Sequence, residues 1–385
     1  MAILEKAPPG SRTYWIWTTC LLLVMVGAGL CYRLQLEHGL AITGMSQDIS
    51  WGLYVAQFTF LVGVAASAVT VVLPYYLHNQ RQFARMIVLG ELLAVAAVTA
   101  CMLFVIVDLG RPSRILNIVL HPMLRSLMFW DLIALSGYLL INFLVAIGTL
   151  HAEREHVPPP AWIKPVVLLS IPWAISIHTV TAFLYSGLPG RSYWLTAILA
   201  PRFLASAFSS GPALLIVLCL VLKKWAGFDV GTDAIRKLAV IVGYATAISM
   251  FFLLVEVFTT FYSGIPEPRA HLKYLFWGLG GSAAPVPWMW LSVLLNLLAL
   301  ILLLARRWWN DMRLLVMACA SIFVSAWIEK GLGLLVGGFV PTSFGRVTGY
   351  APTLPEGIIV LGIWAIGALV VTVTYKITLT VWQED

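Results

Sequence analysis

The chain has 385 residues, of which 61% are hydrophobic and only 11% are charged, and its formal net charge is +7. A soluble domain carries about 25% charged residues, and a soluble fold of this size could not hide so much apolar surface. The composition therefore excludes an ordinary soluble protein and predicts an all-α integral membrane protein. The positive charge does not indicate a nucleic-acid partner, because loop arginines and lysines set the orientation of membrane proteins.

Ten apolar stretches are long enough to cross a bilayer, whose core takes roughly 20 helical residues. We expect a single polytopic domain with spanning helices near residues 14–35, 51–75, 86–108, 127–150, 161–186, 203–222, 237–262, 287–305, 312–337 and 356–381. An even number of helices places both termini on one side. Lys and Arg are in excess on that side, which favours both termini in the cytoplasm of a cell-membrane protein. Arg202 is assigned to a loop on the opposite side.

The loops opposite the termini are longer than those on the side of the termini. They lie near 36–50, 109–126, 187–202, 263–286 and 338–355, and they are rich in glycine, proline and aromatic residues. Long structured loops on one face indicate a docking surface or a site, although they can also be simple connectors.

Ionisable side chains at membrane depth are functional candidates because burying them in lipid is costly. Most of these residues fall in the outer half of the predicted spans, below the long loops. Glu329 and Lys330 are adjacent on a helix, so they point about 100° apart and need separate partners. The candidates that we single out are Glu91, Asp108, Asp131, His178, Glu256, Glu329 and Lys330.

Cofactor motifs are sparse in this sequence. The five cysteines are isolated and form no CxxC, so a cysteine-ligated iron–sulfur cluster is not expected in this chain. His178 is the one histidine well inside a predicted span, which disfavours a haem. No metal-ligand spacing, P-loop or dinucleotide fingerprint occurs, and we expect no metal site.

A quinol would suit this arrangement of polar groups. It needs an apolar slot open to lipid, a hydrogen-bond partner for each oxygen, a proton acceptor and a nearby electron acceptor. Histidine and membrane-buried carboxylates are suitable proton acceptors. The sequence therefore predicts a quinone site formed by Asp108, Asp131, His178, Tyr185 and Gln57. The electron acceptor would have to belong to a partner docked on the face with the long loops.

Three blocks carry a resemblance to a known family. They are DLGRPSR…RSLMFWD (108–131), WGLYVAQFTFLVGVAASAV (51–69) and SIHTVTAFLYSGLPG, which opens a block over 176–214. In this order they resemble the membrane subunits of the polysulfide reductase/NrfD family, over nearly the whole chain. The residues of the blocks are most similar to those of the membrane subunits of DsrMKJOP complexes, which are associated with sulfite reduction, and of Hmc complexes.

The family resemblance implies two four-helix bundles, at 51–186 and 203–337, with flanking helices. It implies quinone exchange beside a ferredoxin-like iron–sulfur subunit on the non-cytoplasmic face, and no haem in this chain. We expect the quinone to be menaquinone. Similarity to the DsrMKJOP subunit further implies a respiratory complex linked to sulfur metabolism. That complex would contain a haem b membrane subunit, a multihaem cytochrome c and a cytoplasmic iron–sulfur subunit.

The matching motif assigns roles to individual residues. Trp130 and Arg111 join Asp108, Asp131 and His178 at the quinone site. The same motif includes Arg114. Together with Arg125 of the same segment, it would dock the partner or tune the carboxylates at the pocket mouth.

Three alternatives remain open. Glu91, Glu256, Glu329 and Lys330 are either parts of a proton path or structural pairs. The chain as a whole could be a secondary transporter or a proton channel, since ten helices with Gly/Pro breaks and buried charges allow it. It could also be a structural anchor without a quinone site of its own.

Overall fold

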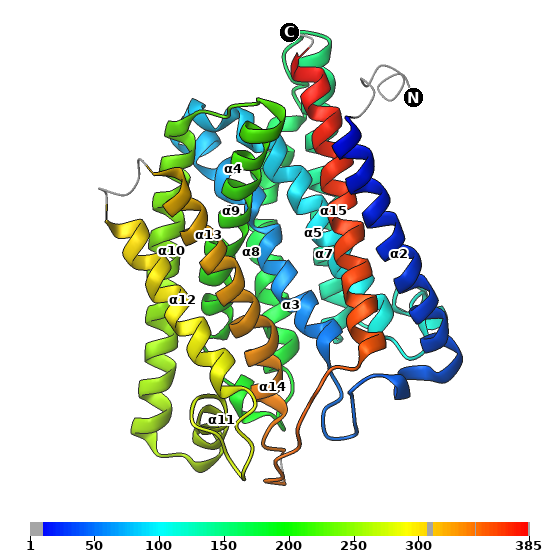
Figure 1. Cartoon of the computed structure of the whole chain (residues 1–385), viewed down its shortest axis with the longest axis vertical. Coiled ribbons are helices and arrows are strands. Elements are labelled where there is room, and N and C mark those ends of the chain that lie inside the picture. The colour runs from blue at the N-terminus through cyan, green and yellow to red at the C-terminus, as the bar shows by residue number, and fades with distance from the viewer. Residues whose placement is uncertain (1–10, 306–310, 343, 384–385) are drawn as a thin grey trace.

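The computed structural model describes residues 11–305, 311–342 and 344–383. Within these ranges ten helical stretches are long and apolar enough to cross a membrane, which confirms the expected all-α integral membrane fold. In lipid every backbone amide and carbonyl needs a partner within the protein, and long apolar sequences satisfy this requirement as helices. Figure 1 shows the long helices standing side by side.

The spanning helices follow the predicted ranges closely. They are α2 (Arg12–His38), α3 (Leu53–Ala65) continued by α4 (Ser67–His78), α5 (Ala84–Asp108), α7 (Leu127–Arg154), α8 (Ile163–Ser186), α9 (Leu199–Ala226), α10 (Thr232–Ser263), α12 (Val286–Leu304), α13 (Met312–Ala326) and α15 (Leu354–Gln383). The span that begins with α13 continues through a π-helical segment, η6 (Trp327–Gly333), into α14 (Leu334–Phe339).

Helix α2 begins and helix α15 ends at the same end of the molecule, which we call the termini side (Figure 1). The opposite end, the loop side, carries most of the short helical elements that connect the spans. These are η1 (Gly39–Ile42), η3 (Pro112–Arg114), α6 (Asn117–Leu120), η4 (Ser192–Trp194) and α11 (Pro266–Phe276). The short element η2 (Arg81–Phe83) precedes α5 on the termini side.

The helices pack in two closed groups. In the first, α3 and α4 pack on α5, α5 on α7, α7 on α8, and α8 returns to α3 and α4. In the second, α9 packs on α10, α10 on α12, α12 on α13, and α13 returns to α9. Helix α3 joins the groups through its contacts with α9 and η6, while α15 and α2 pack against each other along their length (Figure 1).

The second span is the most enclosed element of the fold. Of its most apolar window 94% is buried, compared with 17% for the first span. It breaks between α3 and α4 at Ala66, where α9 comes close. A Cβ on Gly211 would lie 2.9 Å from the amide nitrogen of Ser67 and 2.9 Å from the carbonyl oxygen of Val64, so only glycine allows this approach.

Candidate functional site

A pocket opens on the loop side of the first helix group, between α3, α5, α7 and α8. It holds about 890 Å³ of empty volume, which includes space open to the outside. Its walls are mostly apolar, and side chains from the 109–126 segment close its loop side. The lining residues are Trp51, Val55, Phe58, Met102, Phe104, Val105, Ile106, Asp108, Leu109, Ile115, Ile118, Met128, Asp131, Leu132, Leu135, Leu184 and Tyr185.

Two carboxylates from different helices converge on this pocket. Asp108 is the last residue of α5, and its Oδ1 is buried without a hydrogen-bond partner among the described residues. Asp131 lies in the second turn of α7 and is 5% exposed. The Thr181 hydroxyl of α8 donates a hydrogen bond of 2.8 Å to Asp131 Oδ1. The sequence grouped Asp108 with Asp131, and the structure places both side chains in one cavity.

Tyr185 provides the third polar side chain of the pocket. Its hydroxyl is hydrogen-bonded to the Thr59 hydroxyl of α3. Thr59 already donates to the carbonyl of Val55 at 2.8 Å, so the Tyr185 hydroxyl is the donor in this pair. Trp51 and Trp194 pack on the Tyr185 ring with centroid distances of 5.4 and 5.0 Å, which fixes the orientation of the phenol.

His178 lies beneath the pocket and does not line it. On α8 it shares a face with Thr181 and Tyr185, and it is about 4.5 Å further from the loop side than Thr181. The imidazole is fully buried, and neither ring nitrogen has a hydrogen-bond partner among the described residues. A buried polar group without a partner is costly, so this side chain requires an explanation beyond packing.

The remaining residues predicted for this site lie outside the pocket. Gln57 is buried against the other helices, where its Oε1 accepts hydrogen bonds from Trp327 at 2.8 Å and Trp364 at 3.0 Å. It is Phe58, the next residue on α3, that faces the cavity. Trp130 is 44% exposed, and its indole donates to the carbonyl of Leu124 at 2.8 Å.

The three arginines of the 109–126 segment are also outside the pocket. Arg111, Arg114 and Arg125 are exposed on the loop side of the molecule. The pocket walls contributed by this segment are the apolar side chains of Leu109, Ile115 and Ile118.

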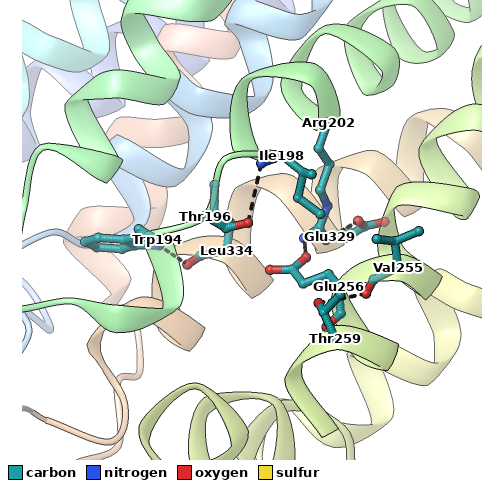
Figure 2. Close-up of polar contacts among 9 residues, drawn as sticks. All are labelled: Trp194, Thr196, Ile198, Arg202, Val255, Glu256, Thr259, Glu329 and Leu334. Atoms are coloured by element: carbon teal, nitrogen blue, oxygen red, sulfur yellow. Dashed lines mark hydrogen bonds and ion pairs between the residues drawn. The ribbon is translucent and has the colours of Figure 1, made fainter. Parts of the chain in front are cut away.

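A second polar cluster lies inside the second helix group. Figure 2 shows Arg202 of α9 pointing between Glu256 of α10 and Glu329 of η6. The guanidinium bonds Glu256 through one nitrogen and lies 2.6 Å from Glu329 through the other. All three side chains are nearly buried, with exposed fractions of 9%, 8% and 12%. The two carboxylates, Glu256 and Glu329, therefore share one cation, Arg202.

The prediction for Arg202 was wrong, because this residue does not belong to a loop. Helix α9 begins at Leu199, four residues before the predicted start of this span at 203, so Arg202 enters the helix and turns inward. The sequence did carry a signal for it. Two carboxylates in the outer halves of predicted spans require a cation at a similar depth, and Arg202 lies at the mouth of the adjacent span.

Lys330 is buried at the contact between the two helix groups. Its ammonium lies 3.3 Å from the carbonyl oxygen of Phe203 and 4.4 Å from the centre of the Phe203 ring. A Cβ on Gly63 of α3 would approach the Lys330 nitrogen to 3.2 Å, so the glycine makes room for this charge. Glu329 and Lys330 thus have separate partners, as their adjacency predicted.

The comparisons with known proteins agree with this architecture. The sequence profile described as "Polysulphide reductase, NrfD" matches residues 41–340, which include both helix groups and both polar sites. The chain belongs to this family. The resemblance of the three sequence blocks is thereby confirmed.

Two relatives of this NrfD-family chain are membrane subunits by name. It is 27% identical to the putative dimethyl sulfoxide reductase membrane subunit of Halobacterium salinarum, with 93% of this chain and 89% of the relative aligned. It is 21% identical to the Hdr-like menaquinol oxidoreductase integral membrane subunit of Archaeoglobus fulgidus, over 98% and 96% of the two chains. A further relative, one subunit of the selenate reductase of Mesobacillus selenatarsenatis, is 21% identical over 68% and 69%.

Glu91 lies apart from both polar sites of this NrfD-family chain. It is on α5 towards the termini side and is 2% exposed. Its Oε2 has no hydrogen-bond partner among the described residues. The structure therefore does not place Glu91 beside Glu256, Glu329 or Lys330, with which the sequence grouped it.

The sequence reasoning also missed Glu356, in the first turn of α15. Its carboxylate is fully buried and accepts hydrogen bonds from the amide of Leu53 at 3.0 Å, the amide of Gly44 at 3.0 Å and the hydroxyl of Tyr350 at 2.5 Å. Burial and the neighbouring carboxylate raise the pKa of Tyr350. Glu356 thereby holds the start of α3, next to Trp51 in the pocket wall.

Proposed function

We propose that this chain is the quinone-binding membrane subunit of a respiratory redox complex, with the quinone head group held in the loop-side pocket. The observation that carries the proposal is the convergence of Asp108, Asp131 and Tyr185 in one apolar cavity below the loop-side surface. Such a cavity combines an apolar slot with a few polar groups, which is the usual composition of a small-molecule site.

The pocket residues fit a quinone by their chemistry. A bound quinol supplies two electrons and two protons. Asp131 is oriented by Thr181 and is placed to hold a proton released in the cavity. The buried Asp108 Oδ1, which has no partner among the described residues, is available to a ligand hydroxyl. Trp51 and Phe58 provide flat apolar walls, and His178 lies one helical turn below as a further proton acceptor.

Electrons would leave through a partner, since the described residues contain no group of three or more His, Cys, Asp or Glu side chains suited to a metal. We propose a ferredoxin-like iron–sulfur subunit docked on the loop side, with the exposed Arg114 and Arg125 at the contact. The names of the relatives support such a complex, because they describe membrane subunits of reductases and of a menaquinol oxidoreductase.

The finer identity of the complex is part of the same proposal. Menaquinone is the proposed quinone, because the relative from Archaeoglobus fulgidus is named a menaquinol oxidoreductase subunit. The block resemblance favours DsrP of a DsrMKJOP complex in sulfur metabolism. Its partners would then be a haem b membrane subunit, a multihaem cytochrome c and a cytoplasmic iron–sulfur protein. The loop side would face away from the cytoplasm, with both termini inside the cell.

A second function, proton movement, is favoured by the buried charges of the second helix group. Arg202, Glu329 and Lys330 line a small cavity, bordered by Glu256, with about 20 Å³ accessible to water, which is enough for about one water molecule. Its other polar lining residues are Ser206, Ser209, Ser249 and Asn296. Hydroxyl and amide side chains around buried charges can hold water, which a proton path requires. Glu91 would serve as an acceptor near the termini side.

The binding of a fluorescent quinol analogue to the purified complex tests the proposal. We expect Asp131→Asn and Asp108→Asn to weaken quenching on binding, while the partner subunits are retained. The matched control is Thr179→Val, because Thr179 is partly exposed on α8 and bonds only Ile175 of its own helix. Unchanged binding in both aspartate variants would move the quinone to another subunit and leave this chain as an anchor, a transporter or a proton channel.

A further inference from the structure

A second large groove lies at the opposite membrane surface from the proposed quinone pocket. It opens between α4, α9 and α10 and holds about 870 Å³ of empty volume, including open space. Its walls come from Leu73, Pro74, Phe208, Val240 and Ile241, and its polar residues are Thr70, His78, Gln80 and Lys237. His78 and Gln80 lie at the termini-side end of α4, and Lys237 lies in the second turn of α10, so the polar residues are at the termini side and the apolar walls run deeper into the bundle.

The dimensions of the groove match one leaflet of a bilayer. On α4, Thr70 and His78 are eight residues apart, which is about 12 Å along the helix axis. Phe208 extends the wall further, because it neighbours the stretch of α9 that meets the α3–α4 break at Gly211. Half of a hydrocarbon core of about 30 Å is about 15 Å, which is the depth that one acyl chain occupies.

The mouth of the groove carries unpaired positive charge. The two acidic residues nearby, Asp229 in the 227–231 connection and Asp233 in the first turn of α10, each face a basic residue other than Lys237. Asp229 lies 2.6 Å from Lys223, and Asp233 lies 4.0 Å from Arg236. Among the described residues, the Lys237 ammonium has no hydrogen bond or ion pair, and it is exposed at the groove. A phospholipid with one acyl chain in the groove would therefore present its phosphate to Lys237 and His78.

We propose that this groove is a binding site for an anionic phospholipid, with the head group on Lys237 and His78 and one acyl chain along Leu73, Val240 and Ile241. Basic pockets between spanning helices favour anionic head groups, and each Lys near the surface strengthens that attraction. The proposal is independent of the quinone site, because the two cavities share no residue and open at opposite ends of the helices.

Lipid titration of the full chain in detergent, followed by native mass spectrometry, tests the proposal. The probes are dioleoyl phosphatidylglycerol and dioleoyl phosphatidylcholine, which have the same chains and different head-group charge. We expect tighter binding of phosphatidylglycerol to the wild type. Lys237→Gln should weaken that binding about fivefold, the effect of one lysine charge near the surface, and should leave phosphatidylcholine binding unchanged.

The control is Lys164→Gln, an exposed lysine at the start of α8 on the same side of the molecule. It should leave phosphatidylglycerol binding unchanged. Val240→Trp fills the groove without removing a charge and should reduce binding of both lipids at this site, whereas Val221→Trp on an exposed position of α9 should not. Equal binding of the two lipids by the wild type, or equal effects of Lys237→Gln and Lys164→Gln, would overturn the proposal. Recovery of a quinone in place of phospholipid from the groove would also overturn the proposal.

Discussion

Thr181 on α8 donates a hydrogen bond of 2.8 Å to Asp131 on α7, across the contact between two spanning helices. The bond orients one carboxylate oxygen and leaves the rest of the carboxyl group facing the pocket. Hydrogen bonds to a charged group contribute about 1.5–3 kcal/mol, roughly twice the value for neutral pairs. The pair therefore links the packing of the first helix group to the chemistry of the pocket.

Replacing Thr181 with valine removes this donor and preserves the shape of the side chain. We expect Thr181→Val to lower the free energy of unfolding by about 1–3 kcal/mol and to slow quinol oxidation by the complex, because Asp131 loses its orientation. Unfolding in detergent and turnover with a quinol analogue measure the two effects. Thr179→Val is the control, and equal turnover in both variants would show that the Thr181 bond has no role in the pocket.

Removing Arg202 should be severely destabilising. Arg202→Gln would leave Glu256 and Glu329 buried without the cation that they share, and breaking one side of a buried ion pair costs about 3–5 kcal/mol. The double variant Arg202→Gln/Glu256→Gln should recover part of that loss. Arg33→Gln, which breaks an ion pair whose arginine is 77% exposed, should change stability by less than about 1 kcal/mol. Thermal unfolding of the purified chains ranks the variants.

The stability of the α11–α14 contact should depend on pH through His271. Its Nδ1 donates to the carbonyl of Gly337 at 2.7 Å, and burial lowers the pKa of the imidazole below its ordinary value. The unfolded chain then binds more protons between the two pKa values, so stability is complete above about pH 6.5 and declines as the pH falls towards the folded pKa.

Hydrogen exchange of α11 measures this dependence of the α11–α14 contact. After correction for intrinsic rates, its amides should keep full protection above about pH 6.5, the ordinary histidine pKa, and lose it as the pH falls below that value. His271→Gln should remove the dependence, because a glutamine does not titrate. A wild-type profile as flat as that of the variant would contradict the prediction.

Glu356→Gln tests the role of the carboxylate that holds the start of α3. A glutamine has one acceptor oxygen, so it cannot accept from Leu53, Gly44 and Tyr350 in the same way. We expect a loss of about 2–3 kcal/mol in unfolding free energy, from a buried group left partly unsatisfied. Weaker binding of the quinol analogue should accompany it, because Trp51 loses its support. A variant with the stability of the wild type would contradict the prediction.

The sequence predicted the spans well because a run of about 20 apolar residues has few alternatives in lipid. It also grouped Asp108, Asp131 and Tyr185 correctly in space, because the alternating directions of the helices bring their loop-side ends together. It failed where the outcome depends on which way a side chain turns. Gln57 and Phe58 are adjacent on α3, and only Phe58 faces the cavity.

Helix ends were the other source of error. Arg202 was assigned to a loop because its helix was expected to begin at 203, and a shift of four residues turned a surface charge into the centre of a buried cluster. The π-helical turn of η6, which carries both Glu329 and Lys330, has no recognisable pattern in the sequence. It changes the direction of the side chains along the span and gives the two charges different partners, Arg202 and Phe203, on the first turns of α9.

Gly63, which makes room for Lys330, places the ammonium close enough to the loop-side pocket for the two polar sites to interact electrostatically. Thr59, which accepts from Tyr185, and Gly63 are one turn apart on α3, about 6 Å along the axis. Buried charges are screened much less than exposed ones, and a low local dielectric constant strengthens their interaction. Any change in charge within the pocket therefore alters the electrostatic work of keeping Lys330 charged. The two polar sites are therefore coupled electrostatically across one turn of α3.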